Sequence, residues 1–171
     1  MIQVTQYTPP SHYANQVREK GRRFLARVPN PTSSQFKKHA YWRDIHDDLY
    51  KLYNGICSYC ASWTPRTPDA GNNHTSVDHF IPKATLPSHA YEWSNYRLCR
   101  ARLNSFKSNS LVVVDPFFIG PNWFVIDFTS FLLKPNPSAA VNLTAKLRIQ
   151  KTIDCLHLND NDYVQERLAD L

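Results

Sequence analysis

Apolar positions three and four residues apart mark one long stretch of the chain as helical. Over residues 35–53 they form a single stripe that an amphipathic helix would turn toward the protein core. The stripe consists of Phe36, Trp42, Ile45, Leu49, Leu52 and Tyr53. Ser33 or Ser34 is the expected N-terminal cap, and Asn54-Gly55 is a typical stop signal. The pattern therefore predicts a helix across residues 35–53.

Further helices are expected toward both ends of the chain. Ser11 can cap a helix that stops before Pro29, because proline interrupts the helical hydrogen bonds. Two more helices are expected at about 138–157 and 160–170. Before them, the β-branched and aromatic runs LVVVDPFFIG and NWFVIDFTSFLLKPN predict a small sheet.

The middle of the chain has the pattern of two strands followed by a helix. The strands are expected at 56–64 and 75–81, with a Pro- and Gly-containing loop between them, and the helix at about 96–107. Together with the flanking helices, this order predicts an α+β fold in one domain over residues 1–171. Its parts would be an N-terminal helical part at 1–54, a core at 55–109, and a β-hairpin with C-terminal helices at 110–171.

Charge and cysteine content narrow the class of partner and the compartment. The net charge of +6 favours an acidic partner, and nucleic acid is the usual one, although moderate basicity also occurs on surfaces that only face water. No stretch has the pattern of a membrane span or a secretion signal. Four cysteines in such a chain favour a reducing compartment. We therefore expect a cytoplasmic protein without a membrane partner.

Residues suited to metal binding and proton transfer are concentrated between positions 78 and 107. Asp78 and His79 end an apolar strand, and Asn95 and Asn104 follow them. Carboxylate and amide oxygens suit a hard divalent cation, and a neighbouring imidazole can activate water. Phosphodiester hydrolysis needs both functions. Each residue alone would also fit a structural histidine, a turn or a cap, but the ordered set of four favours a site.

At these residues the chain resembles the HNH endonucleases, also called ββα-metal or His-Me finger nucleases, of the bacterial stand-alone type. The resemblance covers about residues 56–109 and includes Lys107, the basic residue that often closes the motif. It implies that His79 is the general base and that Asp78 and Asn104 bind a catalytic Mg²⁺ or Mn²⁺. Asn95 would be the amide that holds the loop, and it joins His79 and Asn104 as an expected catalytic residue.

The cysteines only partly follow the zinc pattern of that family. Cys57 and Cys60 have the spacing of half a zinc ribbon. Many HNH proteins have a second pair whose last cysteine directly precedes the helix asparagine. Here Leu103 stands at that position, and Cys99 is out of step with the pattern. We therefore expect structural zinc to be absent or substoichiometric, with Cys57 and Cys60 as the candidate ligands if one is bound. A three-cysteine site that adds Cys99 and a histidine is the less favoured alternative.

Basic residues surround the motif and are the expected nucleic-acid contacts. They are Lys83, Arg97, Arg100, Arg102 and Lys107. At helical spacing Arg97 and Arg100 would share a face and contact phosphates, which adds affinity that depends on salt but not on base sequence. The alternative is a helix face that only contacts water.

The resemblance implies a metal-dependent endonuclease that nicks or cuts DNA. By analogy it also implies a setting in bacterial phage defence, with other subunits of a defence system as partners. Two alternatives stay open. One is a catalytically silent DNA-binding module with the HNH fold, and the other is a nuclease whose substrate is RNA.

Overall fold

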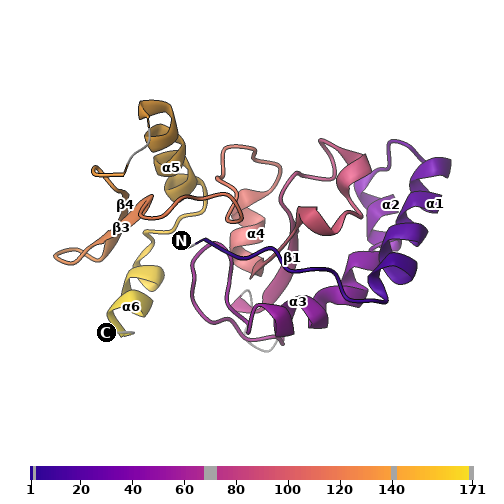
Figure 1. The fold of residues 1–171 in the computed structure, drawn as a ribbon, viewed down its shortest axis with the longest axis horizontal. Helices are drawn as coiled ribbons and strands as arrows, with labels where there is room; N and C mark the ends of the chain where they lie inside the picture. Colours follow the sequence, from indigo (N-terminus) through magenta and orange to yellow (C-terminus); the bar gives the residue numbers. More distant parts are fainter. Residues whose placement is uncertain (2, 68–72, 140–141, 170–171) are drawn as a thin grey trace.

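The computed structural model describes residues 1, 3–67, 73–139 and 142–169 and has an α+β fold, as the sequence predicted. The N-terminal helices lie at one end of the molecule and the C-terminal elements at the other, with β1 and α4 between them (Figure 1). The α-helices are α1 (Glu19–Arg27), α2 (Ser33–Lys38), α3 (His46–Leu52), α4 (Ala101–Lys107), α5 (Leu143–Cys155) and α6 (Asn161–Ala169). The strands are β1 (Thr75–His79), β2 (Tyr96–Arg100), β3 (Phe124–Asp127) and β4 (Leu132–Pro135).

The expected helix over 35–53 is divided into three short elements, so that prediction was wrong in detail. They are α2, the 3₁₀ helix η2 (Tyr41–Ile45) and α3. Thr32, rather than a serine, caps α2 in a reciprocal capping box with Gln35. The helix then ends at His39, whose ring stacks on Phe24 with centroids 3.9 Å apart. The contact lies where the expected helix is interrupted, after α2. The spacing of apolar residues did not predict this interruption.

The first helix ends before Pro29, as the sequence predicted. A π-helical turn, η1 (Ala14–Arg18), leads into α1, which stops at Arg27. Gly21 on this helix lies so close to Tyr91 that an added Cβ atom would be 2.0 Å from the ring Cγ. The Tyr91 hydroxyl donates to the His39 carbonyl at 2.8 Å, and Tyr13 donates to the Tyr91 carbonyl at 2.6 Å. The N-terminal helices therefore hold the connection between β1 and β2.

The strands of the central unit differ from those expected. β1 pairs antiparallel with β2, with Thr75 opposite Arg100, and α4 begins directly after β2. Residues 96–100 are thus a strand and not the start of a helix. Residues 56–64 are not a strand: they form a turn closed by a single bridge between Ile56 and Trp63. The turn passes through Ala61 at a positive φ of 63°, which a regular strand does not allow.

Strand β2 is buried along its whole length because apolar clusters cover both of its faces. Tyr96 and Leu98 pack into the cluster made by the N-terminal helices. Cys99, with Leu103 of α4, packs into the cluster made by the C-terminal elements. Successive strand residues point to opposite faces, so one strand serves both clusters.

The C-terminal part contains the small sheet and the two helices that the sequence predicted. β3 and β4 form an antiparallel pair, and Asn159, between α5 and α6, bonds to both backbone groups of Leu133 at 2.8 and 2.9 Å. The run at 111–120 forms no strand, unlike the expectation. Within the described ranges, no helix is both long and apolar enough to cross a membrane.

Candidate active site

The end of β1 places Asp78 and His79 at a small polar cavity of about 220 Å³. Asn104 reaches the same cavity from α4, and Lys83 from the loop after β1. The full lining is Trp42, Val77, Asp78, His79, Pro82, Lys83, Asn104, Ser108 and Asn109. The fold therefore brings three of the four residues expected to bind metal or act in catalysis, namely the carboxylate, the imidazole and the helix amide, to one cavity, together with Lys83.

Asp78 is a buried carboxylate held by two donors. The Tyr59 hydroxyl donates to its Oδ2 at 2.6 Å. The Lys107 ammonium lies 3.2 Å from Oδ1 and 3.1 Å from Oδ2, and it also donates to the His79 carbonyl at 3.0 Å. Both members of this pair are almost fully buried. Lys107 was expected to contact nucleic acid, but its charge is used inside the protein.

The ring of His79 is buried and oriented by a backbone carbonyl. Its Nε2 lies 3.0 Å from the Ala90 oxygen. A carbonyl can only accept, so Nε2 carries the proton and Nδ1 is the free acceptor of the neutral ring. The edges of Trp42 and Tyr96 pack around it, with centroids 4.6 and 5.4 Å away. Burial, followed by the charge of Lys83, lowers the pKa of His79 to about 3, so the imidazole is neutral at neutral pH.

Asn95 lies outside the cavity and fastens the loop that begins after His79. Its Oδ1 accepts from the Ile81 amide at 2.7 Å, and its Nδ2 donates to the carbonyls of Ile81 and His89, both at 3.0 Å. These bonds hold the loop at Ile81 and at His89, one on each side of Lys83 in the sequence. Asn95 thus positions the cavity wall and does not line it.

The donor atoms at the cavity fit a hard divalent cation. Asn104 donates through Nδ2 to the Ser76 hydroxyl at 3.1 Å, which leaves Oδ1 as its acceptor. Asp78 supplies carboxylate oxygens from β1. Within the part of the chain that the structure describes, no cluster of three or more His, Cys, Asp or Glu could hold a metal. Two protein oxygens suit Mg²⁺, which usually keeps several water molecules.

Two of the expected phosphate contacts, Arg97 and Arg100, are buried in ion pairs. Arg97, only 2% exposed, donates to both Asp115 oxygens at 2.9 and 2.6 Å. Arg100 bonds to Glu166 at 2.7 Å and to Thr64 at 3.1 Å. The expectation that they share a helix face was wrong because residues 96–100 form a strand. Their burial against carboxylates follows from the cover on both faces of β2.

Of the remaining basic residues, only Lys83 faces the cavity. Arg102 on α4 is partly exposed and pairs with Asp160 at 3.0 Å and with Asp162. Lys83 lies over the Trp42 ring at 5.4 Å, and burial lowers its pKa. Among the described residues, no carboxylate lies within 4.0 Å of its ammonium group, so its charge is available at the cavity wall.

The cysteine pair forms a tight turn behind β2. The Sγ of Cys57 accepts from the backbone amides of Tyr59 and Arg100, both at 3.4 Å. Burial raises the pKa of Cys57. The hydrogen bond between the Cys57 and Cys60 side chains lowers the pKa of Cys60 to about 6. The absence of structural zinc stays a prediction, which metal analysis of the purified protein tests.

Comparison with known proteins gives a distant relative. No family model matches the chain. It is similar to Septu protein PtuB of Bacillus thuringiensis, with 24% identity over 166 residues. The similarity covers 95% of this chain and 56% of the relative, so the chain spans little more than half of that protein's length.

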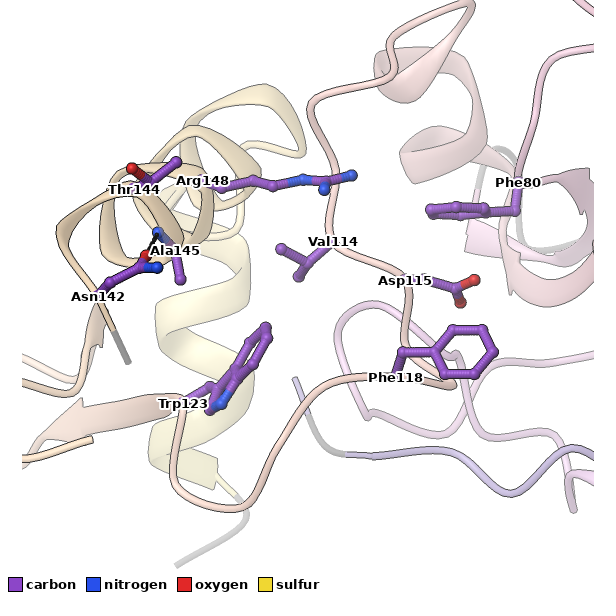
Figure 2. A pocket seen from close by; sticks show the side chains of 9 residues that line it. All are labelled: Phe80, Val114, Asp115, Phe118, Trp123, Asn142, Thr144, Ala145 and Arg148. Atoms are coloured by element: carbon purple, nitrogen blue, oxygen red, sulfur yellow. Dashed lines mark hydrogen bonds between the residues drawn. The ribbon is translucent and has the colours of Figure 1, made fainter. Parts of the chain in front are cut away.

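A second, more apolar cleft lies beside the site and was not expected from the sequence. Phe80, the residue after His79, faces it across from Trp123 and Arg148, and Phe118 lines its edge (Figure 2). Its volume is about 470 Å³, and α5 forms one wall. None of the residues predicted for catalysis or metal binding lines this cleft.

Proposed function

We propose that this protein is a metal-dependent endonuclease of the HNH type that hydrolyses phosphodiester bonds of DNA. The observation that carries the proposal is the cavity at which the acceptor nitrogen of a neutral histidine meets a carboxylate and an amide. A base and oxygen ligands at one place are what hydrolysis of a phosphodiester needs.

His79 is the group that takes the proton in this proposal. Because the Ala90 carbonyl holds the Nε2 proton, Nδ1 accepts a proton from a water molecule as that water attacks phosphorus. The new P–O bond forms while the bond to the leaving oxygen breaks, and the leaving oxygen takes a proton from solvent. Lys83 contributes positive charge at the cavity wall, where the phosphate would lie.

Asp78 and Asn104 would hold the divalent cation, which we expect to be Mg²⁺ or Mn²⁺. A cation held there would stabilise the negative charge that develops on the phosphate oxygens and on the leaving oxygen. Lys107 and Tyr59 keep the Asp78 carboxylate oriented toward the cavity from the protein side.

We place this activity in bacterial antiviral defence, together with other subunits of such a system. The similarity to Septu protein PtuB supports this setting. DNA as the substrate rests on the resemblance of the motif and on the net charge of +6.

Plasmid nicking tests the proposal directly. The protein should nick DNA with Mg²⁺ and not with EDTA. His79→Ala should lower the rate by about two to four orders of magnitude, the usual contribution of a general base, while DNA binding is retained. His89→Ala is the matched control because this histidine lies outside the cavity and, among the described residues, its ring bonds to the neighbouring Ser88 hydroxyl.

The same experiment separates the alternatives. Wild-type protein that binds DNA but never cuts it would favour the silent binding module. Cleavage of structured RNA without cleavage of DNA would favour the RNA nuclease. A His79→Ala protein that cuts at the wild-type rate would overturn the HNH assignment.

A further inference from the structure

The catalytic cavity adjoins a larger polar cleft. Trp42 and Val77 line both, so the two lie side by side at β1. The cleft has a volume of about 570 Å³. Its lining is Trp42, Arg43, His46, Arg66, His74, Thr75, Ser76 and Val77.

The N-terminal part of the chain supplies much of this cleft. Arg43 comes from η2, and His46 begins α3. The His46 Nε2 hydrogen-bonds with the Thr75 hydroxyl of β1 at 3.1 Å, which fixes the helix against the strand. Arg66 reaches the cleft from the segment between the cysteine turn and β1. The cleft therefore exists only because residues outside the central strand–strand–helix unit pack against its edge.

The charges that line the cleft are of one sign among the residues described. Arg43 is exposed, and no described carboxylate lies within 4.0 Å of it. Arg66 pairs with Asp47 at 2.5 Å, but the Asp47 side chain is 70% exposed, and such surface pairs contribute little and exchange readily. Burial lowers the pKa of His46 to about 4, so this residue adds a hydrogen-bonding group and no charge at neutral pH.

This distribution contrasts with that of the basic residues nearest the motif. The charges of Arg97, Arg100 and Lys107 are neutralised by carboxylates inside the protein. Arg102 lines neither the cavity nor the cleft, and it pairs with Asp160 and Asp162 near the surface. A polyanion that reaches the cavity therefore meets available positive charge at Lys83 and along this cleft. Electrostatic attraction of phosphates by arginine is strong and does not depend on base sequence.

We propose that the cleft binds the sugar-phosphate backbone of the nucleic acid on one side of the bond to be cut, with Arg43 and Arg66 as phosphate contacts. The inference rests on the proposed nuclease function and names the part of the substrate that this surface recognises. Contact with the backbone alone makes binding insensitive to sequence and sensitive to salt.

The test measures affinity without catalysis. In a His79→Ala background without divalent metal, fluorescence anisotropy gives the Kd for a labelled DNA duplex over a series of salt concentrations. Arg43→Ala and Arg66→Ala should each weaken binding several-fold and lower the slope of log Kd against log salt by about one, as the loss of one phosphate contact predicts. Arg43→Lys should retain most of the affinity because it keeps the charge.

Two further variants serve as controls. Arg23→Ala removes an exposed arginine of α1 outside the cleft and should leave the affinity unchanged. Asp47→Asn releases Arg66 from its partner and should strengthen binding, the opposite direction to Arg66→Ala. Melting temperatures of all variants show that each remains folded.

The outcomes distinguish the two proposals. If the parent protein binds DNA and both cleft variants bind as tightly as Arg23→Ala, the inference is overturned and the nuclease proposal is untouched. If the wild-type protein neither binds nor cuts any nucleic acid, the proposed function fails and the inference fails with it.

Discussion

At the scale of single residues, the Asp78–Lys107 pair shows how the cavity keeps a charged wall. A buried ion pair adds little net stability, but removing one partner costs about 3–5 kcal/mol because the other charge is left buried alone. Lys107 thus serves Asp78 and the His79 carbonyl together and is not free for phosphate. The interior placement of this lysine holds the carboxylate in position beside the histidine.

The two asparagines should respond differently to alanine. Asn104→Ala removes an oxygen at the cavity, so cleavage should fall and partly recover with more Mg²⁺ or with Mn²⁺.

Asn95→Ala leaves the polar backbone groups of Ile81 without their partner and should lower the free energy of unfolding by about 1–3 kcal/mol as well as the cleavage rate. Urea unfolding and cleavage rates over a Mg²⁺ series measure both effects. An Asn95→Ala protein as stable as wild type would contradict the positioning role.

At the scale of elements, α1 supports the site through the connection between β1 and β2. Gly21 lets the helix approach the Tyr91 ring, and the neighbouring Ala90 carbonyl is the acceptor for both His79 and Tyr96. Helix position and histidine orientation are therefore linked through two adjacent residues. This explains why helices outside the motif matter to its geometry.

Gly21→Ala should destabilise the protein. Helix propensity alone favours alanine by about 1 kcal/mol. The added methyl group would lie 2.0 Å from the Tyr91 ring, however, and overpacking of this kind costs about 1–3 kcal/mol. The steric effect should win, so the midpoint of urea unfolding falls, while the exposed-site variant Arg23→Ala on the same helix stays near wild type. An increase in stability would show that the helix can shift away from the ring.

At the scale of the whole molecule, the site lies between two apolar clusters, one from each end of the chain. The N-terminal cluster packs around His79 through Trp42 and Tyr96, and the C-terminal cluster covers Cys99 and Leu103. Burial from the N-terminal side extends to His46 as well as to His79. Both imidazoles are consequently held in the neutral form.

Stability should fall as the solution is acidified. The pKa values of His79 and His46 are lowered to about 3 and about 4, whereas in the unfolded chain each is near 6.5. Below about pH 6.5 the unfolded state takes up protons that the folded state refuses. Each histidine therefore removes at most about 1.4 kcal/mol of stability per pH unit until its folded pKa is reached.

Urea unfolding at about pH 7 and about pH 5 measures this effect. His46→Gln removes one of the two titrating groups and keeps a polar partner for Thr75, so its loss of stability on acidification should be smaller than that of wild type. Equal losses in the two proteins would show that His46 titrates normally when folded.

Local pattern in the sequence was enough to predict the α+β class, the terminal helices, the small C-terminal sheet, and a carboxylate and imidazole at a strand end followed by a helix amide. These features depend on neighbours a few residues apart. Only the tertiary structure showed that residues 96–100 are a strand and that Arg97, Arg100 and Lys107 are internal. Their carboxylate partners, Asp115, Glu166 and Asp78, lie 18, 66 and 29 residues away in sequence. Strand pairing and burial of a charge depend on such distant partners, which no local pattern specifies.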